Sequence, residues 1–257
     1  MIYYKTDDEI NLIKESAEIL SRAHGEVAKR IEVGVKTKTL DKIAEEYIKK
    51  HKGSPSFKGY NGFPFALCIS VNENVVHGFP SDYELKEGDI ISIDCGVLLN
   101  GYHSDCAYTY PIGEVDDEVR QLLKITKESL YLAIDQASAG NRTGDIGFSV
   151  QNYVEPFGYS VVRELVGHGI GKHLHEPPEI PNYGKRGKGT QLRDGLVIAI
   201  EPMINLGKRN ITQENDGWTI RTVDRRPSAH FEHTVAVRKG LTEILTTHKY
   251  IEEAFNN

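Results

Sequence analysis

Two aspartates, Asp94 and Asp105, are spaced so that they could hold a metal ion between them. They lie in IISIDCGVLLNGYHSDCAYTY, where apolar alternation flanks Asn100-Gly101, the dipeptide typical of a two-residue hairpin turn. A turn at these two residues makes Asp94 and Asp105 diagonal neighbours on one face, with side chains roughly 7 Å apart or less. We expect Gly96, opposite Asp105, to leave open space between the two carboxylates.

An internal repeat brings a third carboxylate to a corresponding position. LKEGDIISID, ending at Asp94, aligns with LRDGLVIAIE, ending at Glu201. Upstream, GVKTKTLDKIAEEYI from Gly34 aligns with GNRTGDIGFSVQNYV from Gly140 at almost the same offset. Two unrelated loop-to-strand segments are the alternative, but they would not be expected to match twice at nearly one offset. A repeat of about 107 residues is too long for a solenoid, and it predicts two similar half-domains about a pseudo-twofold axis.

Two further segments supply the remaining candidate ligands. In AHFEHTVAV, alternation places His230, Glu232 and Thr234 on one face, and a buried Glu232 is costly unless it is paired or metal-bound. In GHGIGKHLHEPP, His168 is the natural nitrogen donor. Crowded carboxylates repel one another, and two divalent cations would remove that penalty. An oxygen-rich set with one imidazole suits Mn, Fe, Co or Zn, and two ions about 3.5–4 Å apart can share a water that attacks a carbonyl. The sequence therefore predicts a two-metal hydrolase.

Helices at matching places in the two halves must position these groups. Thr6 and Glu9 form the capping-box pattern of a helix that reaches about residue 31. Apolar residues at helical spacing predict further helices over 38–50, over 116–137 and after Thr143.

The helices and strands together predict an α+β fold. We expect one catalytic domain over residues 1–257, with half-domains of about 1–112 and 113–257. Helices should cover one face of a mostly antiparallel sheet. Cys95 falls opposite Cys106 on the face toward the helices, where two unbridged buried thiols are favoured over a disulfide.

Composition excludes several classes of protein. The formal net charge of −6 disfavours a nucleic-acid binder. No segment approaches the roughly 20 apolar residues of a membrane span, and the opening MIYYKTDDE lacks the apolar core of a signal peptide. Three cysteines are too few, and odd in number, for a disulfide framework, so we expect a cytosolic protein.

The ordered candidate ligands resemble those of the pita-bread metallopeptidases. NENVVHGFP, GHGIGKHLHEPP, AIEPM, GWTIRT and AHFEHT are similar to the short bacterial form of the methionine aminopeptidases, type I, and the likeness covers essentially the whole chain. The resemblance implies a curved, pita-bread arrangement of the two halves. It also implies removal of N-terminal methionine from new polypeptides, with preference for a small second residue.

The resemblance implies roles for seven residues. Asp94 would bind one metal ion, and Asp105 and Glu232 would bridge both. His168 and Glu201 would complete the other site, and Glu201 would also handle the proton of the water. His77 and His175 would contact the scissile amide and stabilise the tetrahedral intermediate. His173 fits neither role, and we expect it at the surface.

The resemblance also implies an apolar pocket for an unbranched side chain. Its walls would be Phe57, Tyr60, Phe63, Cys68, Leu174 and Trp218. Other members carry different residues at Phe57 and Leu174, often Cys and Phe. His230 replaces the Gln of some relatives, and two roles stay open for it: a hydrogen bond near the metal ions, or a structural contact.

Two rival functions remain. A proline-directed peptidase shares the five ligands but usually carries an additional N-terminal domain. A non-catalytic binding module would have lost ligands, whereas all five are present here. The implied partners are the N-termini of nascent polypeptides, acted on by a monomer with no direct nucleic-acid or membrane contact. Ribosome association would follow from such substrates, although no basic patch argues for it.

Overall fold

The computed structural model describes residues 1–255, and the four predicted helices are all present within them. They are α1 (Asp7–Ala28), α2 (Thr37–Lys50), α3 (Asp117–Asp135) and α4 (Thr143–Val154), and each end lies within about three residues of its expected place. The capping box that opens α1 is formed: the Thr6 hydroxyl accepts from the Glu9 amide, and the Glu9 carboxylate accepts from the Thr6 amide.

A fifth helix, α5 (Lys249–Phe255), was not predicted from the sequence. Its seven residues make about two turns, too few to give a periodic apolar pattern. Ile251 is its buried residue, and the helix packs against α1.

The strand pairings found in residues 1–255 are antiparallel and form four sheets. A four-stranded sheet holds β1 (Ser54–Pro55), β2 (Leu67–Val71), β4 (Ile90–Leu99) and β5 (Tyr102–Pro111). A five-stranded sheet has the order β15 (Glu243–Ile244), β14 (His233–Ala236), β9 (Val197–Ile200), β7 (Gly167–Gly169), β8 (Glu176–Ile180). The two three-stranded sheets hold β13 (Ser228–His230), β10 (Met203–Asn205) and β6 (Ser160–Val161), and β11 (Ile211–Gln213), β12 (Ile220–Thr222) and β3 (Asn74–Val76).

The β4–β5 hairpin has the predicted register. Asn100 and Gly101 form the turn with φ of 50° and 81°, left-handed values that asparagine and glycine tolerate best. Gly96 pairs with Asp105, and the three cysteines of the chain are free and buried, as expected.

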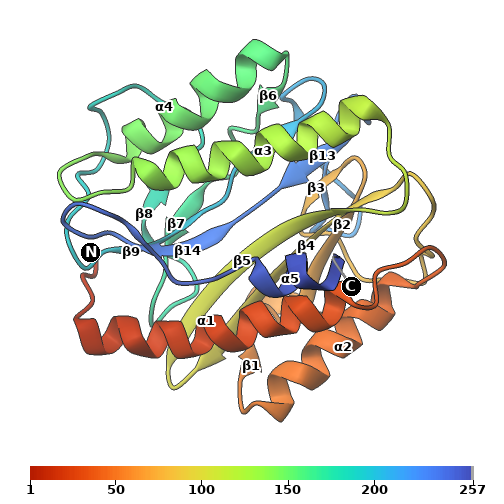
Figure 1. Cartoon of the computed structure of the whole chain (residues 1–257), viewed down its shortest axis with the longest axis horizontal. Coiled ribbons are helices and arrows are strands. Elements are labelled where there is room, and N and C mark those ends of the chain that lie inside the picture. The colour runs from red at the N-terminus through yellow and green to blue at the C-terminus, as the bar shows by residue number, and fades with distance from the viewer. Residues whose placement is uncertain (256–257) are drawn as a thin grey trace.

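The helices cover the face of the hairpin that its odd-numbered β4 residues occupy. Ile91, Ile93, Cys95 and Val97 join one apolar cluster with side chains of α1 and α2, which leaves Asp94 on the other face. Figure 1 shows α1 and α2 on one side of the molecule and α3 and α4 on the other, with β5 and β14 running between them. A second apolar cluster lies mostly within residues 115–237. The division into half-domains near residue 112 remains a prediction.

Two local expectations were wrong. The segment 229–237 is not one strand: β13 ends at His230 and β14 begins at His233, in different sheets. Gly96 does not border open space, because a Cβ there would lie 2.8 Å from Ser56 Cβ and 2.9 Å from the Phe57 ring. Residues 56 and 57 approach β4 so closely that only glycine fits at position 96.

The two carboxylates aligned by the internal repeat, Asp94 and Glu201, lie at different positions relative to their strands. Asp94 lies inside β4, whereas β9 stops at Ile200, immediately before Glu201. Pro202 follows Glu201 and has no amide hydrogen to continue a ladder.

Among residues 1–255, none of the helices combines the length and the apolar character that a bilayer crossing needs.

Candidate active site

The candidate site lies where β5 meets the start of β14. The Asp105 amide donates to the Thr234 hydroxyl at 2.9 Å, and that hydroxyl donates to the Asp105 carbonyl at 2.7 Å. The Glu232 amide donates to the Ala107 carbonyl at 3.0 Å. These bonds hold Glu232 beside the hairpin that carries Asp94 and Asp105. The thiol of Cys106 donates to the Glu232 carbonyl at 3.1 Å from the opposite face.

The five-stranded sheet adds the other two candidate ligands. His233 of β14 pairs with Ile200 of the antiparallel strand β9. Glu232 comes just before His233 and Glu201 just after Ile200, so the two glutamates lie side by side at the same end of these strands. His168 lies in β7, next to β9. A Cβ at Gly167 would lie 2.4 Å from the Ala199 carbonyl oxygen, so a glycine is needed for β7 to approach β9 this closely.

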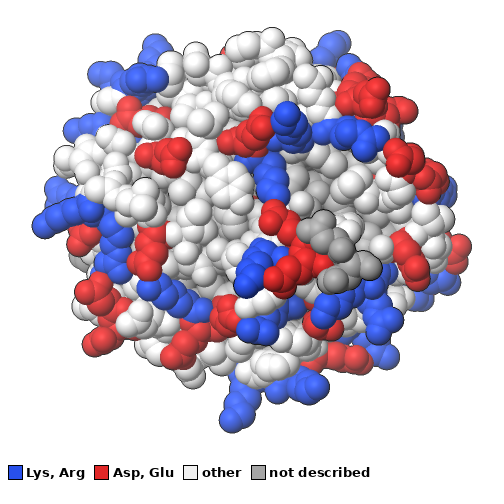
Figure 2. All heavy atoms as spheres, in the orientation of Figure 1, with Lys and Arg blue, Asp and Glu red and all other residues white. Residues whose placement is uncertain are grey.

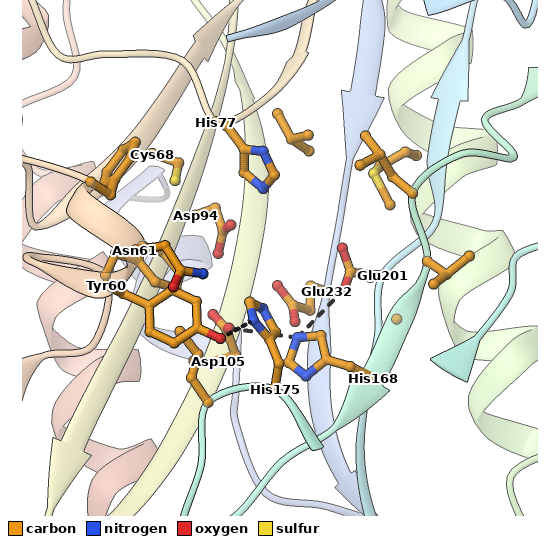
Figure 3. A pocket seen from close by; sticks show the side chains of 18 of the residues that line it. Tyr60, Asn61, Cys68, His77, Asp94, Asp105, His168, His175, Glu201 and Glu232 are labelled. Carbon is orange, nitrogen blue, oxygen red and sulfur yellow. Dashed lines mark hydrogen bonds and ion pairs between the residues drawn. The ribbon is translucent and has the colours of Figure 1, made fainter. Parts of the chain in front are cut away.

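The five predicted ligands surround one point (Figure 3). His168 Nε2 lies 4.0 Å from Asp105 Oδ2 and 3.7 Å from Glu201 Oε1. One ligand atom each from Asp105, His168 and Glu232 all lie within 4.8 Å of one another. Asp94 faces the same space, close enough for its charge to raise the pKa of Asp105. A divalent ion would bring such oxygens and an imidazole nitrogen closer together.

Burial makes this cluster electrostatically costly. It raises the pKa of Asp94 to about 7. Burial and the neighbouring carboxyl groups raise the pKa values of Asp105, Glu201 and Glu232 well above their ordinary range. Among residues 1–255, Asp94 Oδ1 and Glu232 Oε1 have no hydrogen-bond partner although they are buried. Unpaired buried oxygens in a crowd of carboxyl groups fit a cation-binding site.

His168 is held in the form that a metal ligand needs. Its Nδ1–H donates to the Gly169 carbonyl at 2.9 Å, which leaves the lone pair of Nε2 facing the carboxylates. Burial and the neighbouring His175 lower the pKa of His168 to about 3, so the ring is neutral at pH 7.

His230 lies beside the cluster rather than away from it. Its Nε2 is 3.7 Å from Glu201 Oε2, too far for a hydrogen bond, and it has no partner among residues 1–255. Burial lowers the pKa of His230 to about 3. His230 therefore lies near the candidate ligands, and both roles left open by the sequence stay predictions.

His77 and His175 approach the cluster from opposite sides. His77 follows β3 with a φ of 58°, a left-handed value that costs a non-glycine residue free energy and is found most often at functional sites. Burial lowers its pKa to about 4. The His175 ring packs edge-on against the His168 ring, with 4.3 Å between centroids. His173 is exposed, as expected, and does not line the cavity that holds these groups.

All thirteen residues named from the sequence line one cavity of about 620 Å³. The aromatic wall is ordered by edge-to-face contacts, with the Phe63 ring 5.1 Å from that of Trp218. Phe57, Cys68 and Leu174 are buried behind it. Sequence reasoning missed several lining residues, Asn61, Val76, Glu164, Leu165, Met203 and Glu179 among them. Nearness in sequence could have indicated three of them: Asn61 follows Tyr60, Val76 precedes His77, and Met203 lies two residues after Glu201.

The model of metallopeptidase family M24 matches residues 11–239. The chain belongs to this family. This M24 chain is 50% identical over 246 residues to the methionine aminopeptidase of Clostridium perfringens and to methionine aminopeptidase 1 of Bacillus subtilis, which covers 96% of this chain and 99% of each relative. Family membership makes the chain a metal-dependent peptidase, as the ligand set predicted.

Solved structures of relatives confirm the α+β, pita-bread fold. The methionine aminopeptidase of Thermotoga maritima superposes with a TM-score of 0.94 at 43% identity, covering 96% of this chain and 100% of that one. A prolidase of Pyrococcus horikoshii superposes at 0.78 with 24% identity, and the likeness covers 63% of that chain. The second likeness shows the shared fold alone, and it leaves the rest of the prolidase without a counterpart in this chain.

Proposed function

We propose that this metallopeptidase removes the N-terminal methionine from polypeptides that carry a small second residue. The observation that carries the proposal is that the carboxylate cluster and an apolar, aromatic-walled pocket share one cavity. An exopeptidase that removes an apolar first residue needs its apolar pocket directly beside its metal-binding groups. The pocket buries the side chain, and the cluster lies next to the bond to be cleaved. The relatives at 50% identity carry the name of that activity.

We propose two divalent ions, Mn, Fe, Co or Zn, as the cofactors. Asp94 would hold one ion, His168 and Glu201 the other, and Asp105 and Glu232 both. Divalent ions polarise a peptide carbonyl and lower the pKa of water toward neutrality. The unpaired oxygens of Asp94 and Glu232 and the available Nε2 of His168 fit such ions.

The remaining steps belong to side chains of the chain itself. Glu201 would accept the proton of the attacking water, since its carboxylate lies in the cluster, 3.7 Å from His168 Nε2. His77 and His175 would hold the scissile amide and the developing oxyanion. Tyr60, Phe63, Trp218 and the residues behind them would exclude water from the methionine side chain, with Phe57, Cys68 and Leu174 closing the pocket.

We further propose that the chain acts as a cytosolic monomer on nascent polypeptides, with transient ribosome association. The substrate argues for this setting, because N-terminal methionine is exposed as chains are made. Surface charge adds no support for an RNA contact: on the face in Figure 2, Lys and Arg alternate with Asp and Glu. The net charge of −6 points the same way.

One assay separates the proposal from its rivals. The chain is stripped with a chelator, loaded in turn with Mn, Fe, Co and Zn, and tested on Met-Ala-Ser and on an X-Pro peptide while bound metal is counted. We expect release of methionine from Met-Ala-Ser only in loaded samples. Cleavage of the X-Pro peptide instead would make it a proline-directed peptidase. Metal-loaded chain that leaves both peptides intact would favour a non-catalytic role.

A further inference from the structure

A hydrogen bond joins the pocket wall to the candidate catalytic histidine. The Tyr60 hydroxyl lies 2.8 Å from His175 Nδ1, a contact between residues 115 positions apart. The two rings meet edge to face, with 5.1 Å between centroids at 71°. Figure 3 shows the Tyr60 hydroxyl pointing at the His175 ring. A tyrosine ring that served only as a wall would not need this contact.

The loop that carries Tyr60 is built to hold this orientation. Tyr60 begins a 3-10 turn, η1 (Tyr60–Gly62), in which Asn61 has a left-handed φ of 48°. Two backbone hydrogen bonds lie within the loop. The Tyr60 amide donates to the Phe57 carbonyl, and the Phe63 amide donates to the Tyr60 carbonyl, each at 2.9 Å. The backbone on either side of Tyr60 is therefore held in place, and the contact with His175 holds the side chain.

The direction of this hydrogen bond determines which nitrogen of His175 carries a proton. A neutral imidazole has one N–H donor and one bare acceptor nitrogen. Among residues 1–255, Nδ1 is the partner found for the Tyr60 hydroxyl, and a hydroxyl that donates there requires Nδ1 to carry no hydrogen. The imidazole then carries its own hydrogen on Nε2. That nitrogen is the one left for a molecule in the cavity.

We propose that Tyr60 is a positioning residue: its hydroxyl donates to Nδ1 of His175 and thereby presents Nε2–H to the substrate as a hydrogen-bond donor. The inference rests on the proposed function. The ring of Tyr60 contacts the apolar side chain of the substrate while its hydroxyl orients the donor for the carbonyl oxygen. Occupancy of the pocket and alignment of His175 are thus carried by one side chain.

Kinetics of Tyr60→Phe test the role of the hydroxyl, since this change keeps the ring and the wall. We expect kcat on Met-Ala-Ser to fall roughly tenfold to a hundredfold, the range typical for loss of an orienting partner, with KM nearly unchanged. Phe63→Leu is the matched control, because it alters the wall and removes no hydroxyl, and it should raise KM instead. A rise in KM at unchanged kcat in Tyr60→Phe would reduce Tyr60 to a wall residue.

A double-mutant cycle locates the effect. In a His175→Ala background, Tyr60→Phe should cost almost nothing more, because the group that it orients is gone. The same loss of kcat in both backgrounds would show that Tyr60 acts independently of His175 and would overturn the proposal.

The tautomer is measured without turnover. Nitrogen-15 spectra of the zinc-loaded, unaltered chain should show His175 with bare Nδ1 and protonated Nε2 at pH 8, above the ordinary pKa of imidazole. Tyr60→Phe should shift the ring toward a mixture of tautomers. An Nδ1–H form in the unaltered chain would contradict the inference. A chain inactive on Met-Ala-Ser that still shows the Nε2–H form would contradict the proposed function and support the role of Tyr60.

Discussion

At the scale of single residues, Asp105 takes part in two different sets of contacts. Its backbone exchanges two hydrogen bonds with the Thr234 hydroxyl, and its buried carboxyl group lies between Asp94, His168 and Glu232. The backbone bonds hold β5 against β14, and the carboxyl group is proposed to bridge the two ions. The two sets of contacts use different atoms, so they can be separated by changing the side chain alone.

We expect Asp105→Ala to abolish turnover and to lower metal occupancy, because one change removes a proposed ligand of both ions. The backbone bonds to Thr234 persist in the variant, so the chain should still fold. The measurements are bound metal per chain, turnover of Met-Ala-Ser and the circular dichroism of the variant. Full occupancy with a normal rate would rule out the bridging role.

At the scale of elements, a buried ion pair fastens the N-terminal segment to the start of β8. Lys5 Nζ lies 2.6 Å from Glu176 Oε2, with side chains 4% and 2% exposed. The other oxygen of Glu176 accepts from the His173 amide at 3.1 Å, and the Lys5 amide donates to the Gly195 carbonyl at 2.7 Å. The pair therefore holds the turn that carries His175.

We expect Glu176→Ala to lower the free energy of unfolding by about 3–5 kcal/mol, since it leaves the Lys5 ammonium buried without a counter-charge. The double variant Lys5→Met/Glu176→Leu should recover most of this loss, because neither charge remains to be compensated. Urea unfolding of the three proteins measures the effect. A Glu176→Ala variant within about 1 kcal/mol of the parent would show that the ion pair is not needed for stability.

Element boundaries also explain where sequence reasoning was wrong. The alternation of AHFEHTVAV suggested one strand, yet the chain leaves one sheet after His230 and enters another at His233. The alternation itself is kept in the contacts, as His230 lies near Glu201 while Phe231 packs against Tyr108. A pattern of side-chain burial does not reveal which sheet supplies the hydrogen bonds. That choice depends on strands distant in the sequence.

At the scale of the whole molecule, folding concentrates buried ionisable groups whose pKa shifts have opposite signs. Burial raises the pKa of Asp94 to about 7 and those of Asp105, Glu201 and Glu232 well above their ordinary range, so these groups bind more protons in the folded, metal-free chain than in the unfolded chain. Burial lowers the pKa values of His168 and His230 to about 3, and these rings have the opposite effect. Other buried and half-buried imidazoles act in the same way, among them His24, His77, His103, His233 and His248. The histidine contribution is complete only about one unit above the ordinary pKa of about 6.5, at about pH 7.5.

Between about pH 7.5 and 8.5 the carboxyl groups dominate this balance, and the buried thiols, whose pKa values are also raised, act in the same direction. Raised folded pKa values mean that stability is lost as the pH rises through them. We expect the free energy of unfolding of the metal-free chain to fall with pH, by up to about 1.4 kcal/mol per pH unit for each carboxyl group still protonated. A divalent metal should remove the decline. The measurement is urea unfolding at several pH values, with chelator and with added Zn. Metal-free stability that is flat or rises over this range would contradict the prediction.

The sequence by itself determined what depends on short separations. Asn100-Gly101 and the alternation around it determined the hairpin register, and with it the shared face of Asp94 and Asp105. Helical periodicity and the Thr6 cap determined the four longer helices. These are local effects, in which the backbone preference of a few residues is decisive. The resemblance to a known family added the ordered ligands and the pocket walls.

Only the tertiary structure decided which distant groups meet. The Thr234 bonds to Asp105, the Lys5–Glu176 pair and the Tyr60–His175 contact each join residues more than 100 positions apart. No periodic pattern records such pairings, because they arise from the packing of whole sheets and loops against one another. Gly96 illustrates the same limit: its sequence neighbours suggested free space, and a loop from elsewhere in the chain fills it.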